Sequence, residues 1–123
     1  HYYRAKAYLD AGKTDGAMED LKILAKDTRN VYGAEAKYKV AQIYFDGGQT
    51  DKAEQEVLNY IEVSTPHTYW LARSFVLLAD VYMKSGRNLD AKQYLLSLKQ
   101  NYQADDDIAG MIESRLEKLK TEN

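Results

Sequence analysis

The stretch that decides the fold of this chain is residues 36–53, with the sequence AKYKVAQIYFDGGQTDKA. Its first half places apolar side chains at helical spacing: Ala36, Val40, Ile43 and Tyr44. This spacing predicts a helix with one apolar face. Gly48 follows, and glycine can end a helix in the left-handed conformation without a Cβ penalty. A second helical pattern starts directly after it, so the stretch predicts two helices joined by a short turn.

The same pattern occurs three times along the chain. Each copy has a tyrosine, a glycine four residues later and an alanine five residues after the glycine: Tyr8–Gly12–Ala17, Tyr44–Gly48–Ala53 and Tyr82–Gly86–Ala91. The alanines recur after 36 and then 38 residues. A repeat of this length predicts helical hairpins that stack on one another. We expect each alanine where two helices cross closely, because a larger side chain would push them apart.

Polar residues mark the expected helix starts. Thr14, Thr50 and Asn88 each stand two residues after a turn glycine, so we expect them to cap the following helices. At the junction before the third hairpin, Thr65 and Pro66 are expected to be the N-cap and the first helical residue. Gly33 lies near the other junction.

The chain as a whole is predicted to be all-α. The hairpins are expected at about residues 1–29, 33–63 and 66–103 of a single domain, followed by a capping helix at about 105–121. That last helix should start at the acidic run 105–107 and bury one apolar stripe: Ile108, Met111, Ile112, Leu116 and Leu119. Tyr69 and Trp70 are expected to be core residues, with a role as surface anchors as the alternative.

The composition excludes several classes of protein. The chain has 123 residues, 45% of them hydrophobic and 29% charged, which is an ordinary globular composition. A formal charge of −2 offers no basic stripe for nucleic acid. No apolar run approaches the ~20 residues of a membrane span, so we expect no direct membrane insertion.

The chain begins with His1 inside a helix-like pattern, and we expect it to be part of a longer protein; a tag remnant on a small protein is the alternative.

The sequence lacks the residues of a catalytic or metal site. There is no phosphate-binding loop, no dinucleotide fingerprint, no zinc-protease motif and no cysteine. The only histidines are His1, expected to be mobile, and His67, expected in an exposed turn. The acidic run 105–107 lacks the alternating oxygen ligands and turn glycine of a calcium loop. We therefore expect no enzyme activity, no cofactor and no metal.

With this repeat, the chain resembles the tetratricopeptide repeat family. The resemblance rests on the three Tyr–Gly–Ala patterns and covers nearly the whole chain, although the spacing exceeds the ~34 residues usual for the family. Stretches such as residues 36–44 are also similar to repeat proteins of bacterial envelopes, which favours a periplasmic or envelope location. The resemblance implies a right-handed superhelix whose first helices line a concave groove for a protein or peptide. The implied groove positions are Tyr2, Lys6, Leu9, Glu35, Tyr38, Gln42, Phe45, Arg73, Val76, Asp80 and Met83.

Two features leave alternatives open. Tyrosine and glutamine stand where some family members have the lysine and asparagine of a carboxylate clamp, so we expect no such clamp. Phe45 and Met83 either contact a ligand or pack against a further helix of a longer chain. A structural role without a ligand is the other functional reading, in which the edge formed by Tyr2, Tyr3 and Ala7 pairs with another copy or with an upstream repeat.

Overall fold

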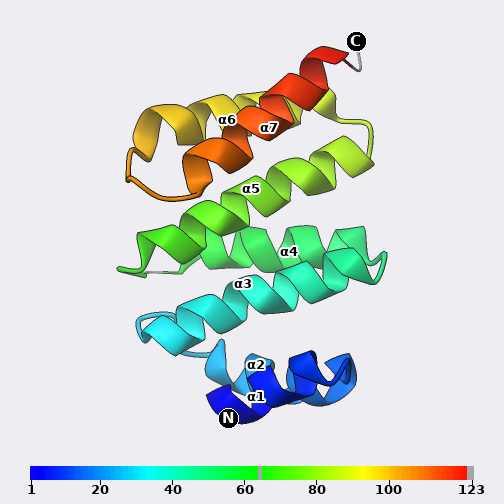
Figure 1. The fold of residues 1–123 in the computed structure, drawn as a ribbon, viewed down its shortest axis with the longest axis vertical. Coiled ribbons are helices and arrows are strands. Elements are labelled where there is room, and N and C mark those ends of the chain that lie inside the picture. Colours follow the sequence, from blue (N-terminus) through cyan, green and yellow to red (C-terminus); the bar gives the residue numbers. More distant parts are fainter. Residues whose placement is uncertain (64, 122–123) are drawn as a thin grey trace. The chain divides into compact units, whose positions relative to one another are not determined.

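All regular structure in residues 1–63 and 65–121, which the computed structural model of the chain describes, is α-helical (Figure 1). This confirms the all-α prediction. The helices of these residues are α1 (Tyr2–Asp10), α2 (Thr14–Leu24), α3 (Val31–Asp46), α4 (Thr50–Glu62), α5 (Thr68–Lys84), α6 (Asn88–Asn101) and α7 (Ile108–Thr121).

The chain divides into two compact units, His1–Leu71 and Ala72–Asn123, with the boundary inside α5. In the first unit α1 packs on α2, α2 on α3 and α3 on α4 (Figure 1). In the second unit the rest of α5 contacts α6 through ring pairs, and α6 packs on α7. The expected single repeat domain stays a prediction.

The three Tyr–Gly–Ala turns have the same backbone geometry. Gly12, Gly48 and Gly86 have φ angles of 74°, 80° and 77°, which confirms the left-handed conformation expected from the sequence. The amide after each glycine donates a hydrogen bond to the carbonyl of the tyrosine of the pattern, at 2.7, 2.8 and 2.8 Å. This pair of features is the Schellman ending of a helix. The alanines of the pattern are fully buried: Ala17, Ala53 and Ala91.

The predicted helix caps were wrong. The helices already begin at Thr14, Thr50 and Asn88, and the cap positions belong to the residues before them: Lys13, Gln49 and Arg87, none of which makes a side-chain cap hydrogen bond. The cause lies in the turn itself. The amide of each cap residue donates the last hydrogen bond of the preceding helix. The carbonyl of the same residue accepts the first hydrogen bond of the next helix, at 3.0–3.2 Å. The second helix therefore starts one residue earlier than a capping side chain would allow.

The start of α5 also differs from the prediction. The helix begins at Thr68 instead of Pro66. The Thr65 hydroxyl donates to the Thr28 carbonyl at 2.7 Å and accepts from the His67 amide at 3.1 Å. His67 is half-buried instead of exposed, and its Nε2 lies 2.9 Å from the Arg29 carbonyl. These bonds hold residues 65–67 against the loop after α2, so the helix starts only beyond them.

The last helix begins at Ile108, later than the predicted residue 105. Asp106 precedes it and accepts from the Ile108 amide at 2.9 Å and from the Tyr102 hydroxyl at 2.6 Å. The acidic run therefore forms the approach to the helix and supplies its capping carboxylate. Ile108, Ile112 and Leu119 are buried, which confirms one apolar face on α7.

Candidate functional site

Most of the predicted groove positions of the first unit lie on one surface made by α1 and α3. We call it the α1–α3 face and define it by Tyr2, Lys6, Glu35, Tyr38, Lys39, Gln42 and Asp46. On α3, Tyr38, Lys39, Gln42 and Asp46 stand three, four, seven and eleven residues after Glu35, so they form one stripe of that helix. On α1, Tyr2 and Lys6 are one helical turn apart.

Tyr2 and Glu35 join the two helices of this face. The Tyr2 hydroxyl donates to the Glu35 carboxylate, at 3.2 Å to Oε1 and 3.4 Å to Oε2. Lys39 approaches the same carboxylate from one turn along α3, with 2.5 Å between Nζ and Oε2. Burial, reinforced by the negative charge and hydrogen bond of Glu35, raises the pKa of the Tyr2 phenol. The phenol therefore stays a hydrogen-bond donor at neutral pH.

A second polar chain runs along α3 on the same stripe. The Tyr38 hydroxyl donates to Gln42 Oε1 at 2.8 Å, and Gln42 Nε2 donates to Asp46 Oδ1 at 2.8 Å. Each residue fixes the side chain one turn further on. The Tyr38 ring also contacts the Trp70 ring, with 5.7 Å between centroids, and Trp70 contacts Tyr69 edge to face. The Gln42 and Asp46 side chains are thus held in place by their neighbours on α3.

The remaining predicted positions of this unit differ in exposure. Lys6 is exposed, with its ammonium 5.6 Å from the centre of the Tyr2 ring. Leu9 packs against the core between the first helices, so it serves the hairpin. Phe45 is half-buried. Tyr38 is only 7% exposed, so a ligand would reach its polar partner Gln42 more readily than its ring.

The predicted positions on α5 lie in the second unit and have different surroundings. Val76 is 3% exposed and belongs to the core. Asp80 accepts two hydrogen bonds from Arg115 of α7, at 2.7 and 2.9 Å. Arg73 and Met83 are half-buried. The Asp80 carboxylate is therefore already engaged by a helix of its own chain.

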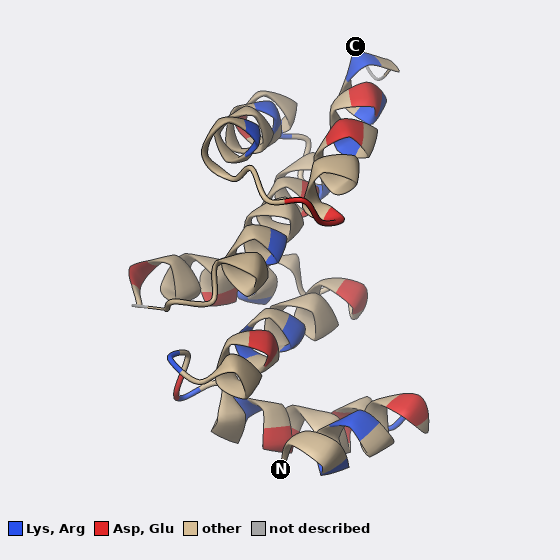
Figure 2. Cartoon of the chain, turned by 60° about the vertical axis from the view of Figure 1, so that its left-hand side comes forward, with Lys and Arg blue, Asp and Glu red and all other residues tan. Residues whose placement is uncertain are grey.

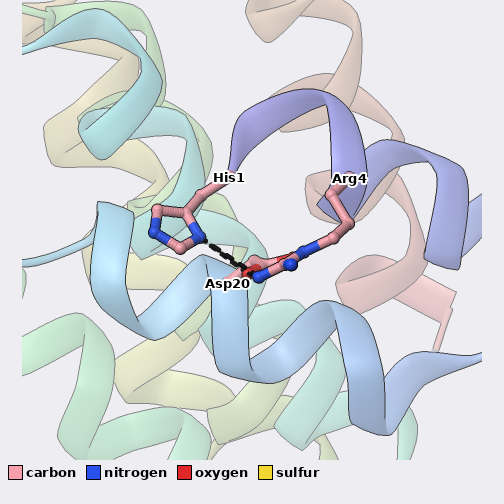
Figure 3. A network of polar contacts seen from close by, with 3 residues as sticks. All are labelled: His1, Arg4 and Asp20. Atoms are coloured by element: carbon pink, nitrogen blue, oxygen red, sulfur yellow. Dashed lines mark hydrogen bonds and ion pairs between the residues drawn. The ribbon is translucent and has the colours of Figure 1, made fainter.

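An ion pair between the exposed Arg4 and the buried Asp20 ties α1 to α2 (Figure 3). Arg4 binds the Asp20 carboxylate through two atoms, and His1 Nδ1 lies 2.8 Å from Asp20 Oδ1. The expectation of a mobile His1 was wrong, because its ring is tied to a carboxylate of the next helix. The hydrogen bonds from Arg4 hold the pKa of Asp20 below its usual value. The network positions the helix that carries Tyr2 and Lys6.

Sequence reasoning missed several residues of the face. Lys39 and Asp46 stand four residues after Glu35 and Gln42, and this i, i+4 spacing was the signal that could have found them. Tyr32, which is a neighbour of the face and not a member of it, was missed as well. Its ring lies 4.4 Å from that of Tyr2, a contact between helices that no local spacing indicates.

Comparison of the chain with known protein families, with curated proteins and with solved structures found no match in any of the three. In the part of the chain that the structure describes, no cluster of His, Asp or Glu side chains is arranged to hold a metal ion. Within residues 1–63 and 65–121, no helix has both the length and the apolar character needed to cross a membrane.

Proposed function

We propose that this chain is a tetratricopeptide-like scaffold that binds an extended or helical segment of another protein on the α1–α3 face. The observation that carries the proposal is the ordered set of polar side chains on this face. Tyr2, Glu35 and Lys39 hold one another, and Tyr38, Gln42 and Asp46 do the same. Side chains that are fixed beforehand lose little entropy on binding.

The three hairpins support the same reading. Their three turns share the Schellman geometry, and the alanine of each pattern is buried, as expected of stacked repeats. We propose that the hairpins continue into a right-handed superhelix, in which the α5 positions would extend the groove. A periplasmic or envelope location and membership in the tetratricopeptide family are part of this proposal.

The chemistry of the face indicates what kind of ligand would bind. It offers positive charge at Lys6 and Lys39 and negative charge at Glu35 and Asp46, beside tyrosine rings. A face with both signs of charge suits a peptide with alternating polar groups more than a polyanion. Tyrosine adds contact area with a polar tip. A single groove of this kind would bind with micromolar affinity, about −8 kcal/mol.

The test is a selection of peptide ligands on the intact chain, followed by calorimetric titration of the peptides that are retained. Lys6→Glu and Gln42→Ala alter the face. Lys52→Glu and Gln55→Ala are matched controls on α4, and Lys52, like Lys6, stacks its ammonium over a tyrosine ring. We expect each face variant to weaken binding about tenfold, which corresponds to ~1.4 kcal/mol. The controls should bind like the wild type.

Two outcomes would contradict the proposal. Peptides whose affinity is the same for the face variants and the wild type would place the binding site elsewhere. A selection that yields no ligand would favour a purely structural role.

A further inference from the structure

A cleft of about 380 Å³ opens between α6 and α7 in the second unit. Leucines from both helices line it: Leu89 and Leu96 from α6, Leu116 and Leu119 from α7. Leu89 is 71% exposed and Leu96 is 44% exposed. The cleft is thus an apolar surface built by two neighbouring helices.

The exposed leucines form a second apolar stripe on α6. Leu89 and Leu96 are two turns apart, and Lys92 and Lys99 lie between and beyond them at helical spacing. The buried stripe of α6 is a different one, made by Ala91, Leu95 and Leu98. A helix with apolar side chains on two faces has one face left to cover, and exposed apolar patches of this kind mark interaction sites.

Charged residues border the cleft, with lysines alone on the α6 side and two glutamates and one lysine on the α7 side. The α6 side carries Lys92 and Lys99, and the α7 side carries Glu113 and Glu117 together with Lys120. Figure 2 shows that acidic and basic positions both occur along the helix that leads to the C-terminal label. Lys99 pairs with Glu113 at 2.7 Å. Lys120 and Glu117 are 3.9 Å apart. All four side chains are more than half exposed, so these pairs contribute little and can exchange partners.

This distribution is self-complementary. In a two-fold arrangement, a residue on one copy contacts a second residue on the partner, and the reverse contact occurs at the same time. If α6 of one copy lies on α7 of the other, the lysine side of each cleft faces the glutamate side of the other copy's cleft. The two-fold symmetry makes this contact occur twice. The leucines of both copies then cover one another at the centre.

We propose that the α6–α7 cleft is a dimerisation surface that takes a second copy of this chain by two-fold packing. Leu89 enters the cleft of the other copy, and Lys92 faces its acidic side. Ten residues line the cleft, fewer than the roughly 20–30 on each side of a standard interface. The dimer is therefore weak, with a dissociation constant in the micromolar range or above.

Sedimentation equilibrium of the intact chain from about 10 µM to about 1 mM tests the dimer. We expect reversible dimerisation in the wild type and a monomer for Leu89→Glu. Leu58→Glu is the matched control, because Leu58 is an exposed leucine of α4 in the first unit. It should dimerise like the wild type. Circular dichroism of each variant checks that the helices are retained.

Charge reversal tests the two-fold geometry. The double variant Lys92→Glu/Lys99→Glu has two acidic sides, and Glu113→Lys/Glu117→Lys has two basic sides. Each alone should be monomeric, and an equimolar mixture should form a heterodimer in native mass spectrometry. The single variant Lys92→Glu serves as the test if the double variants fail to fold, because it leaves the Lys99–Glu113 and Lys120–Glu117 pairs intact. It should weaken the dimer.

A wild type that stays monomeric at 1 mM would overturn the proposal and leave the cleft to a partner protein or to further residues of a longer chain. A dimer unchanged by Leu89→Glu would overturn it as well. Peptide binding on the α1–α3 face should be the same for Leu89→Glu and wild type, so this proposal and the scaffold proposal can fail separately.

Discussion

Arg4 and Asp20 bind each other through two parallel hydrogen bonds, from Nε to Oδ2 at 2.7 Å and from Nη2 to Oδ1 at 2.6 Å. Asp20 is only 1% exposed, whereas most of the Arg4 side chain is exposed. A carboxylate in such a place is tolerated because the guanidinium fork satisfies both of its oxygens. This pair therefore ties α1 to α2, beside the apolar contacts of the two helices.

The first prediction concerns the pH dependence of stability. The folded protein holds the pKa of Asp20 below its value of 3.8 in model compounds, mainly through the hydrogen bonds from Arg4. The pair therefore contributes its full stability above about pH 3.8, and this contribution is lost as the pH falls through the lowered folded-state pKa. We expect Asp20→Asn to melt at a lower temperature than the wild type at pH 7, with the difference shrinking towards pH 2.

Thermal melts between pH 2 and pH 7 check this prediction. Asp10→Asn, which alters an exposed aspartate of α1, is the control and should follow the wild-type profile. A constant difference between Asp20→Asn and wild type across this range would show that the stability of the pair does not depend on the charge of Asp20.

The second prediction concerns the close approach at Gly33. A Cβ atom there would lie 1.8 Å from the Asp27 carbonyl oxygen and 2.6 Å from that of Leu24. Both obstacles are backbone atoms that cannot swing aside. We expect Gly33→Ala to destabilise the fold by about 3 kcal/mol or more. Gly110→Ala has open space in α7 and should stabilise it by about 0.5–1 kcal/mol. Urea denaturation of both variants gives the comparison, and similar changes in both would contradict the clash.

The third prediction concerns the two glycines of the α3–α4 turn and separates the effect of a left-handed backbone from the effect of steric room for a Cβ atom. Gly48 has a φ of 80° and nothing near its missing Cβ. Gly47 has a φ of −84°. We expect Gly48→Ala to cost about 1–2 kcal/mol because an L-residue is strained in the left-handed region. Gly47→Ala should be close to neutral. Equal free energies of unfolding for the two variants would mean that the turn relaxes out of its Schellman geometry.

The fourth prediction concerns the attachment of α7. Arg115 binds Asp80 through two hydrogen bonds, and both side chains are about three-quarters buried. We expect Arg115→Ala to cost about 1 kcal/mol and to speed hydrogen exchange of the α7 amides, because the helix loses its tie to α5. The control is Lys120→Ala, which alters a highly exposed residue of the same helix. If α7 exchanges at the same rate in both variants, leucine and isoleucine packing alone holds this helix.

Much of the fold could be predicted from local pattern. The apolar spacing of residues 36–44 predicted which face of α3 is buried, and Gly48 predicted where the helix ends. Both features depend on residues within one or two helical turns of each other. The wrong caps at Thr14, Thr50 and Asn88 have a local cause too. The same residue serves both helices of the tight turn, so the backbone itself replaced the expected side-chain caps.

The candidate site was predicted only in part. The α3 positions Glu35, Tyr38 and Gln42 were named from the resemblance to the tetratricopeptide repeat family, which implied them as groove residues. The contact of Tyr2 with Glu35 and the engagement of Asp80 by Arg115 were not predicted, because their partners are 33 and 35 residues away in the chain. Groove positions inferred from a resemblance also cannot tell that Val76 is buried.

The sequence by itself determined that this chain is helical, where each hairpin turns and which glycines take the left-handed conformation. These properties depend on interactions between near neighbours, which a periodic pattern records directly. Only the tertiary structure decided that Asp20 is buried under Arg4, that Asp80 is held by Arg115 and that Leu89 lies exposed beside a cleft. Each of these depends on how one helix is rotated against the next, which is set by packing over the whole contact.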